Sequence, residues 1–300
     1  MWYKLLNSLL KVLSKLPLGV HYFFAHVIAF LAHRVVCYRR KTVRENLQRS
    51  FPDISEQQRR TIERCFYQNL SMCMVETIWM MSATEEDVKN HVEFRNMELI
   101  TEAFDQGRNV TALFGHIGNW EWICTTPLFL RPNDAVATLY KPLTNTTFDK
   151  IYYDMRSRFG VHCIPKNQAL RALVDYKRRQ QPMVLAFIAD QSPSRNSLHF
   201  FTSFLHQRTP FITGWEELSK RQDSRVIYVD IQRPKPGHYI YTVEMLCDHS
   251  KDETPYTLTE RYANRLEENI LLCPELWLWS HRRWKHSDKK MTPRHGIVNS

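Results

Sequence analysis

The spacing of apolar residues predicts helices in the first third of the chain. Residues 1–34 and 38–50 both have helical spacing, and the second of these segments is strongly basic. After a turn at Pro52, Ser55 and Gln58 have the spacing of a capping box. An amphipathic pattern of helical period continues beyond them, so we expect a long helix to begin at Ser55.

From residue 92 onward, short β-branched apolar runs alternate with helical patterns. The runs of strand length cover residues 92–94, 109–115, 135–140, 161–165, 182–190, 224–233 and 238–246. Helical spacing covers residues 96–105, 119–130, 147–159, 169–181, 210–222 and 257–274. This alternation predicts an α/β fold with a central, largely parallel sheet flanked by helices.

Residues 16–32, LPLGVHYFFAHVIAFLA, form an apolar-rich run that is interrupted by His21 and His26. Because about twenty apolar residues are needed to cross a bilayer, the run is of borderline length. We expect an N-terminal membrane-associated helix here, and a buried core helix is the alternative. The basic flank is heavier on the C-terminal side of the run, which favours a cytoplasmic position for the body of the protein.

The formal net charge of +10 predicts an anionic partner, such as nucleic acid, an anionic membrane or a phosphorylated substrate. Nucleic acid is not expected, because binding of single strands needs aromatic rings along a basic groove. The aromatic residues of this chain concentrate in apolar runs instead. Seven cysteines without a C-x-x-C pair are typical of thiols in a reducing compartment.

The stretch TALFGHIGNWEW, residues 111–122, carries the candidate chemistry. His116 follows the strand expected at residues 109–115, between Gly115 and Gly118, and Glu121 comes five residues later. In open α/β sheets, ligands gather at the carboxyl ends of the strands. We expect Glu121 to reach back and hold one imidazole nitrogen, so that the other nitrogen acts as a general base.

Other catalytic signatures are absent from the sequence. It contains no G-x-S-x-G elbow, no P-loop, no G-x-G-x-x-G fingerprint and no H-E-x-x-H motif. His116 would therefore act on an external nucleophile, and no metal or other cofactor is expected.

GHIGNWEW resembles the H-x4-D/E motif of the lysophospholipid acyltransferase superfamily. More narrowly, it is similar to the late lipid A biosynthesis acyltransferases of the lauroyl and myristoyl transferase type. Further blocks resemble that family in the same order, and together they cover roughly residues 10–286. These blocks are PLGVHYFFAHVIAFLAHRVVCYRRKTVRENLQRSFPD, LYKPLTNTTFDKIYYDMRSRFG, FIADQSP and CPELWLWSHRRWKH.

The resemblance implies a glycerol-3-phosphate acyltransferase-like fold and a transfer reaction at the inner membrane. An acyl chain would leave a thioester, on acyl carrier protein or on coenzyme A. It would be received by a hydroxyl group of a phosphorylated lipid A precursor. The basic runs at residues 39–41, 177–179 and 282–283 are candidate contacts for acidic acyl carrier protein or for the anionic membrane.

The family motifs also imply roles for single residues. His116 matches the catalytic base and Glu121 its acidic partner. Arg156 would hold a phosphate, the thioester arm or the developing oxyanion, and Asp190 would fix that arginine. Backbone N–H groups near the glycines are the alternative oxyanion donors. The remaining residues expected to bind substrate are Asn119 and Lys141.

Lys141 departs from the family, which often has arginine there, so a bidentate role is in doubt at this position. We expect residues 1–37 to form the anchoring helix, residues 38–286 the catalytic domain and residues 287–300 a flexible polar tail. Three alternatives stay open: acylation of another membrane lipid, such as an amino-acid lipid or a glycolipid, a nucleic-acid-binding protein, and a catalytically silent membrane scaffold.

Overall fold

The computed structural model of the protein describes residues 2–291. The expected flexible tail, residues 287–300, therefore lies largely outside the described residues. One seven-stranded sheet forms the centre, with the strand order β1-β9-β8-β2-β5-β3-β4. These strands are β1 (Val92–Arg95), β2 (Val110–Phe114), β3 (Ala135–Tyr140), β4 (His162–Pro165), β5 (Met183–Ile188), β8 (Arg225–Lys235) and β9 (His238–Cys247).

All neighbouring strands of this sheet run parallel except β8 and β9, which form an antiparallel pair. The central strand β2 is buried at all five positions, as expected for a strand covered on both faces. The prediction of a mixed α/β fold with a largely parallel sheet between helices is therefore confirmed. A separate hairpin consists of β6 (Phe201–Phe204) and β7 (Gln207–Pro210).

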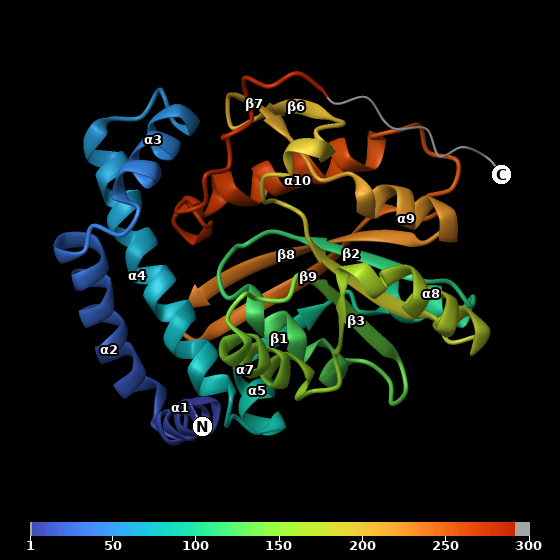
Figure 1. Ribbon diagram of the computed structural model, residues 1–300, viewed down its shortest axis with the longest axis horizontal. Helices are drawn as coiled ribbons and strands as arrows, with labels where there is room; N and C mark the ends of the chain where they lie inside the picture. Colours follow the sequence, from blue (N-terminus) through green and yellow to red (C-terminus); the bar gives the residue numbers. More distant parts are fainter. Residues whose placement is uncertain (1, 292–300) are drawn as a thin grey trace.

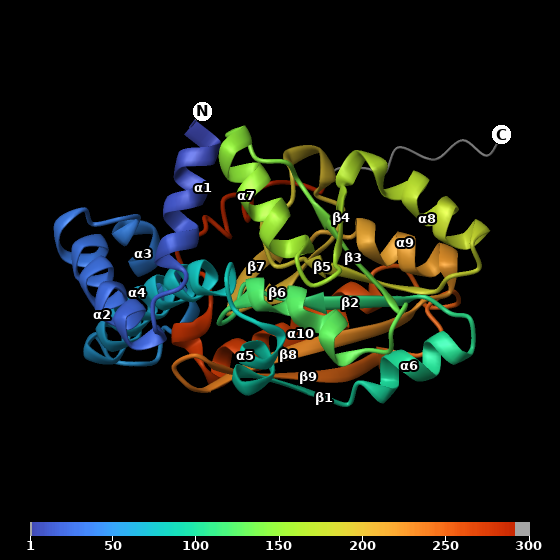
Figure 2. The same cartoon turned by 90° about the horizontal axis from the view of Figure 1, so that it is seen from below.

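Helices cover both faces of the sheet (Figures 1 and 2). The later helices are α5 (Glu85–His91), α6 (Glu98–Asp105), α7 (Thr146–Ser157), α8 (Ala169–Arg178), α9 (Gly214–Gln222) and α10 (Thr257–Leu272). The 3-10 helix η2 (Trp120–Phe129) lies on the same face as α6, and shorter 3-10 turns occupy η3 (Lys166–Gln168), η4 (Arg195–Ser197) and η5 (Pro274–Leu276). Side chains of α8 and α9 pack on the opposite face, against alternate residues of β3 and β5.

The N-terminal helices form a group beside the sheet (Figure 1). They are α1 (Trp2–Leu13), α2 (Leu18–Phe30) with its π-helical extension η1 (Leu31–Val35), α3 (Arg40–Ser50) and α4 (Glu56–Met80). The capping box expected at Ser55 and Gln58 is confirmed, because both of its reciprocal hydrogen bonds are present. Leu18–Val35 is the one stretch in residues 2–291 that is long and apolar enough to cross a membrane.

Three local expectations needed correction. The helix expected at 210–222 begins only at Gly214, because Pro210 pairs with Phe201 in the hairpin. The segment expected as a helix at 119–130 is a 3-10 helix that contains Pro127, whose ring nitrogen cannot donate to a helical carbonyl. The N-terminal helix is interrupted before Leu18 by Pro17, so α1 and α2 are separate.

Candidate active site

The sheet brings His116 and Asp190 together at its carboxyl edge. Phe114 ends β2 and is paired in register with Ile188, which ends the neighbouring parallel strand β5. His116 and Asp190 each stand two residues beyond these partners. Because parallel strands run in the same direction, both side chains emerge at one edge of the sheet, where ligands of α/β proteins bind.

The His116 imidazole is held by the Asp190 carboxylate. Nδ1 lies 2.6 Å from Oδ1 of Asp190, and the backbone N–H of His116 donates to Oδ2 at 2.8 Å. The indole N–H of Trp277 donates to the same Oδ2, also at 2.8 Å. The Asp190 side chain is 2% exposed and that of His116 is 14% exposed. The carboxylate is thus fixed from three sides and in turn orients the ring.

The surroundings of Asp190 keep it ionised. Burial alone would raise the pKa of this carboxyl group, but the charge of His116 and hydrogen bonds from His116 and Trp277 outweigh burial and hold the pKa at about 2. On the far side of the ring, the amide nitrogen of Gln191 lies 3.2 Å from Nε2 of His116. These contacts match the tautomer with hydrogen on Nδ1, which leaves Nε2 as the basic atom.

The two glycines beside His116 meet different steric needs. A Cβ atom on Gly115 would lie 2.6 Å from Cδ1 of Leu266 in α10, so a larger residue here would require the Leu266 side chain to move. Gly118 has φ +54°, in the left-handed region that glycine enters without steric cost. A Cβ atom there would also lie 3.0 Å from the ring of Tyr239. The glycines therefore shape the turn on which His116 stands.

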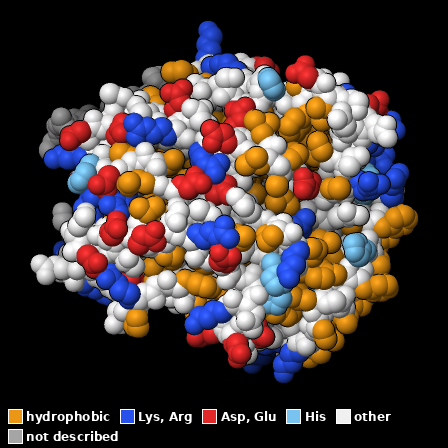
Figure 3. Space-filling model, turned by 180° about the vertical axis from the view of Figure 1, so that it is seen from behind, with side chains coloured by type: hydrophobic (Ala, Val, Ile, Leu, Met, Phe, Trp, Pro, Cys, Tyr) orange, Lys and Arg blue, Asp and Glu red, His pale blue; other side chains and the backbone are white. Residues whose placement is uncertain are grey.

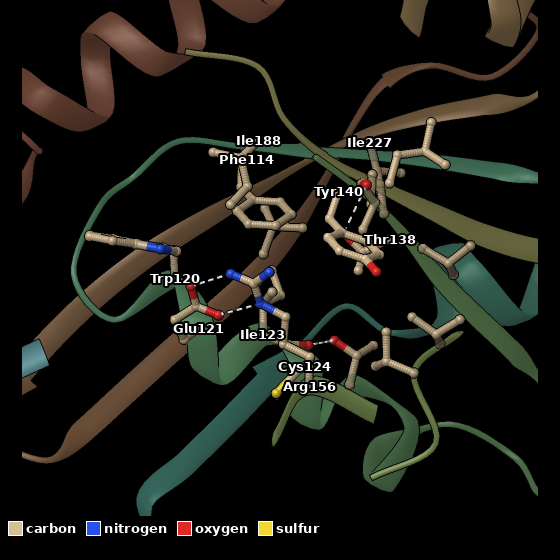
Figure 4. Close-up of a pocket in the computed structure, with 18 of the residues that line it drawn as sticks. Phe114, Trp120, Glu121, Ile123, Cys124, Thr138, Tyr140, Arg156, Ile188 and Ile227 are labelled. Carbon is tan, nitrogen blue, oxygen red and sulfur yellow. Dashed lines mark hydrogen bonds and ion pairs between the residues drawn. The ribbon is translucent and has the colours of Figure 1, made fainter. Parts of the chain in front are cut away.

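Glu121 has no hydrogen bond or ion pair with His116 within the described part of the chain, so the expected pairing is wrong. Its two carboxylate oxygens accept instead from Arg156, from Nε at 2.7 Å and from Nη2 at 2.6 Å (Figure 4). The expected contact between Asp190 and Arg156 is wrong as well. Glu121 stands in the first turn of η2, which directs it toward α7 and Arg156.

The pair of Glu121 and Arg156 is sheltered, with side chains 12% and 26% exposed. Burial alone would lower the pKa of the Arg156 guanidinium, but the hydrogen bonds and charge of Glu121 outweigh burial and raise it. The guanidinium also lies 5.1 Å from the ring centre of Tyr152. Arg156 is therefore a fixed cation, and its Nη1 has no hydrogen bond among the residues that the structure describes.

Asn119 does not line the cavity described below, which corrects the expectation that it binds substrate. Its side chain is buried at 1% exposure, and its amide nitrogen donates to Oε2 of Glu76 at 3.0 Å. The hydroxyl group of Tyr241 donates to the backbone carbonyl of Asn119 at 2.8 Å. Asn119 thus fixes the turn that follows His116.

Three backbone N–H groups of the glycine turn, those of His116, Ile117 and Gly118, already have acceptors and are not free to bind an oxyanion. These hydrogen bonds run from His116 to Asp190, from Ile117 to the Gly115 carbonyl and from Gly118 to the Leu276 carbonyl. The side chains of Arg156 and Gln191 are donors that do line the cavity.

A cavity of about 350 Å³ opens beside His116. Its polar end is lined by His116, Glu121, Lys141, Arg156 and Gln191. Its other walls are mainly apolar and come from one face of the sheet, from α6 and from η2, as Figure 4 shows in part. They include Ala112, Phe114, Val136, Val184, Ile227 and Val243. This shape fits a flexible apolar ligand whose polar group lies at His116.

Lys141 follows β3 and lines both this cavity and an adjoining hollow of about 270 Å³. Arg156 and Asp149 also line the second hollow. Lysine presents a compact charge with three donors, so Lys141 and Arg156 place two cationic side chains at this hollow, beside the carboxylates of Glu121 and Asp149. In residues 2–291, no group of three or more His, Cys, Asp or Glu side chains is arranged to hold a metal ion.

Three contacts of the site were not anticipated. Gln191 lies 3.2 Å from Nε2 of His116, Trp277 donates to Asp190, and the Trp120 ring packs edge-on against the imidazole at 5.0 Å between ring centres. Gln191 directly follows Asp190, so the motif containing both was a usable signal. Trp277 could not be found in this way, because it reaches the site only through folding of the C-terminal segment.

The C-terminal aromatic and basic run packs inside the protein. Trp277, Trp279 and Arg283 are 2%, 0% and 0% exposed, and the Arg283 guanidinium lies 4.5 Å from the ring centre of Phe211. Residues 282–283 are therefore not a docking site through Arg283, which corrects that expectation.

The whole chain is similar to known proteins of one family. The family model described as "Bacterial lipid A biosynthesis acyltransferase" matches residues 1–286. The chain is similar to the lipid A biosynthesis lauroyltransferase of Escherichia coli K12, with 24% identity over 93% of this chain and 89% of the relative. It is also similar to the palmitoleoyltransferase of the same strain, with 23% identity over 90% and 87% of the two chains. A lipid A biosynthesis acyltransferase of Haemophilus influenzae is 22% identical over 93% and 88%.

Proposed function

The chain belongs to the bacterial lipid A biosynthesis acyltransferase family, and from that premise we propose how this enzyme works. A fatty acyl chain moves from an acyl thioester to a hydroxyl group of a lipid A precursor, with His116 as the general base. The observation that carries this proposal is the pairing of His116 with Asp190 at the mouth of an apolar cavity.

His116 is suited to remove a proton from the acceptor hydroxyl. Asp190 holds the Nδ1–H group, so Nε2 faces the reaction and accepts the proton once Gln191 gives way. The alkoxide oxygen forms a bond to the thioester carbonyl carbon, and a tetrahedral oxyanion results. The C–S bond then breaks, and the imidazolium returns its proton to the departing sulfur. General-base assistance of this kind contributes roughly 10²–10⁴-fold to the rate.

Arg156 is the proposed donor to the negative charge of the substrate. Glu121 fixes the guanidinium plane and leaves Nη1 directed to no partner within the described residues. Such a preorganised donor stabilises either the oxyanion or a phosphate group. Lys141 adds a second positive charge at the hollow that it shares with Arg156.

The family match and the apolar cavity support our proposals for the acyl donor, the acceptor and the cellular location. The apolar walls of the cavity bind the acyl chain of the donor. The donor is a thioester of acyl carrier protein or of coenzyme A. The acceptor is a phosphorylated glycolipid, and the catalytic domain works at the cytoplasmic face of the inner membrane. The fold is of the glycerol-3-phosphate acyltransferase type. No cofactor takes part in the steps proposed for these residues.

The test compares lipids acylated by the wild-type protein and by the variant His116→Ala. Purified membranes that contain a lipid A precursor receive a labelled acyl thioester, and mass spectrometry identifies the lipid that gains the label. We expect labelled lipid A with the wild type and a loss of at least 10²-fold in rate with His116→Ala. The control is His206→Asn, which alters an exposed histidine outside the cavity. Normal turnover by a folded His116→Ala protein would refute the mechanism, and label in another lipid would refute the acceptor.

A further inference from the structure

The apolar N-terminal helix α2 is docked along the body of the protein. His21, Ala25 and Ala29 recur at intervals of four residues, and all three are buried. They face α4, so one side of α2 lies against another helix and not against solvent. Figure 1 shows the two helices side by side.

Two polar contacts to α4 hold the continuous segment of α2 and its extension η1, one from each of these two elements. The hydroxyl group of Tyr22 donates to Oε1 of Glu76 at 3.1 Å, and Nε2 of His33 lies 2.9 Å from Oε1 of Glu63. Eleven residues separate Tyr22 from His33, which corresponds to about 17 Å along a helix. The two helices therefore run antiparallel over most of the length of α2.

The partner helix α4 is unsuited to the interior of a membrane. Arg60 and Arg64 are exposed on it, and its buried Glu63 is bound by Arg44 at 2.9 Å. Charged side chains at the centre of a bilayer are strongly unfavourable. If α2 crossed the membrane, it would have to break its contacts with Glu63 and Glu76 or carry α4 into the hydrocarbon.

The opposite side of α2 is an exposed apolar strip. Its side chains are 39–67% exposed, and they are Val20, Phe23, Phe24, Val27, Phe30 and Leu31. Only 22% of the Leu18–Val35 stretch is buried within the protein. Hydrophobic side chains are dense on this side of the molecule in Figure 3. A strip of this kind, left uncovered on the protein, is typical of a helix that lies in a membrane surface.

Helix α1 continues the strip toward the candidate active site. Leu5, Leu9 and Val12 of α1 are more than half exposed. The hydroxyl group of Tyr3 donates to Asp154 of α7 at 2.7 Å, and α7 also carries Arg156. Figure 2 shows α1 between α2 and α7. Basic residues along α1 and after α2 supply the charge that anionic headgroups attract.

We propose that α2 lies in the plane of an anionic bilayer surface and does not cross it. The protein is then attached to one leaflet only, and its N-terminus is on the same side of the membrane as the catalytic domain. This inference rests on the packing of α2 and is independent of the chemistry proposed for His116.

A topology experiment tests the orientation directly. The full chain carries one epitope tag before Met1 and another after Ser300, and a protease is added to spheroplasts or to inverted inner-membrane vesicles. We expect both tags to be protected in spheroplasts and both to be cleaved in inverted vesicles. Cleavage of the N-terminal tag alone in spheroplasts would show a spanning helix and overturn the proposal.

A binding experiment tests the surface. Purified full-length protein is sedimented with vesicles of phosphatidylglycerol and phosphatidylcholine, and the triple variant Phe23→Asp/Phe24→Asp/Phe30→Asp is compared with Leu272→Asp. Leu272 is 71% exposed on α10, away from the strip. We expect at least a tenfold loss of vesicle binding for the triple variant and none for Leu272→Asp. Circular dichroism checks that both variants are folded.

Two results of the binding experiment would overturn the proposal. One is unchanged vesicle binding by the folded triple variant. The other is a wild-type protein that ignores vesicles but forms a dimer in light scattering that the triple variant cannot form. In that case the strip would be covered by a second copy of the chain. Acyl transfer to substrate dispersed in detergent, measured in parallel, separates either failure from a failure of the proposed function.

Discussion

The carboxylate of Asp190 lies 2.6 Å from Nδ1 of His116, although the two residues are 74 positions apart in the chain. Glu121, only five positions away, binds Arg156 instead. The site therefore contains two separate pairs: the Asp190 carboxylate holds the His116 imidazole, and the Glu121 carboxylate holds the Arg156 guanidinium. Each pair has its own experimental consequence.

Replacement of the aspartate tests the first pair. Asp190→Asn keeps the shape of the side chain but removes the carboxylate oxygen and the negative charge that hold Nδ1 of His116. We expect kcat to fall by about 10²–10⁴-fold, because the general base is no longer oriented or stabilised. The control is Asp53→Asn, which changes an exposed aspartate in the same way and should leave kcat unchanged.

The pH profile of the same variant gives a second readout. Since the pKa of Asp190 is held at about 2, this carboxyl group stays ionised throughout the working range and produces no acid limb of its own. Asp190→Asn should therefore lower kcat/KM without removing an acid limb from its pH profile. An acid limb that is present in the wild type and absent from Asp190→Asn would show that Asp190 titrates in the working range, which would contradict this assignment.

The second pair should behave as one unit. Arg156→Lys cannot keep the two-pronged contact with Glu121, and we expect kcat/KM to fall at least tenfold, which corresponds to about 1.4 kcal/mol. Glu121→Gln should have a similar effect by releasing the guanidinium. If the residues act together, the double variant Glu121→Gln/Arg156→Lys will be little worse than the poorer single variant. Fully additive losses in kcat/KM would show independent roles.

The depth of the cavity should select the acyl chain. Ala112 lies within β2, four residues before His116 in the sequence, and lines the apolar wall. Ala112→Leu should obstruct the cavity at that depth and lower kcat/KM for long acyl thioesters at least tenfold while short ones still react. The measurement is a series of saturated acyl donors of increasing length. Equal losses for all lengths would indicate general overpacking of the core and not a limit on chain length.

The buried Glu76 should matter for both stability and rate. Its carboxylate accepts hydrogen bonds from Asn119, Tyr239, Tyr22 and the backbone N–H of Gly237. Glu76→Gln replaces one acceptor by a donor, and we expect the free energy of unfolding to fall by about 1–3 kcal/mol.

The effect of Glu76→Gln on rate separates positioning from stability alone. Asn119 belongs to the turn after His116, so we expect kcat to fall with little change in KM when the assay is run well below the unfolding temperature. A wild-type kcat under those conditions would mean that Glu76 only stabilises the fold.

His281 should make the protein less stable as the pH falls. Its Nε2 accepts a hydrogen bond from the backbone N–H of Ser192 at 3.1 Å, which requires an unprotonated nitrogen. Burial lowers the pKa of His281 to about 4 in the folded protein, against about 6.5 in an unfolded chain. As the pH falls from about 6.5 to about 4, His281 binds a proton in the unfolded chain but not in the folded protein. The free energy of unfolding therefore decreases over this pH range.

Urea unfolding from neutral pH down to about 4.5 measures this loss. The variant His281→Asn should be less stable at neutral pH but should show a flatter dependence on pH than the wild type. The charges of Asp190, Arg283, His116 and Lys285 also act on His281. The comparison therefore uses a variant in which only His281 is replaced. Parallel pH dependences for the two proteins would exclude His281 as the responsible group.

Local patterns in the sequence determined much of the fold. The apolar run at residues 135–140 corresponds to β3 at Ala135–Tyr140, and the spacing of Ser55 and Gln58 forms the expected capping box. These features depend on backbone geometry and on neighbours a few positions away, which a single sequence contains. The family resemblance read from the motifs is likewise confirmed over residues 1–286.

Only the tertiary structure decided which side chains meet at the site. Sequence proximity suggested Glu121 as the partner of His116, but adjacency of β2 and β5 selected Asp190. The order of strands in a sheet arises from packing between distant segments, and no local spacing encodes it. The same holds for Asn119, whose place in the motif suggested substrate while its environment is the buried Glu76. The chain sequence thus specified the candidate histidine, and strand pairing chose the carboxylate that orients its ring.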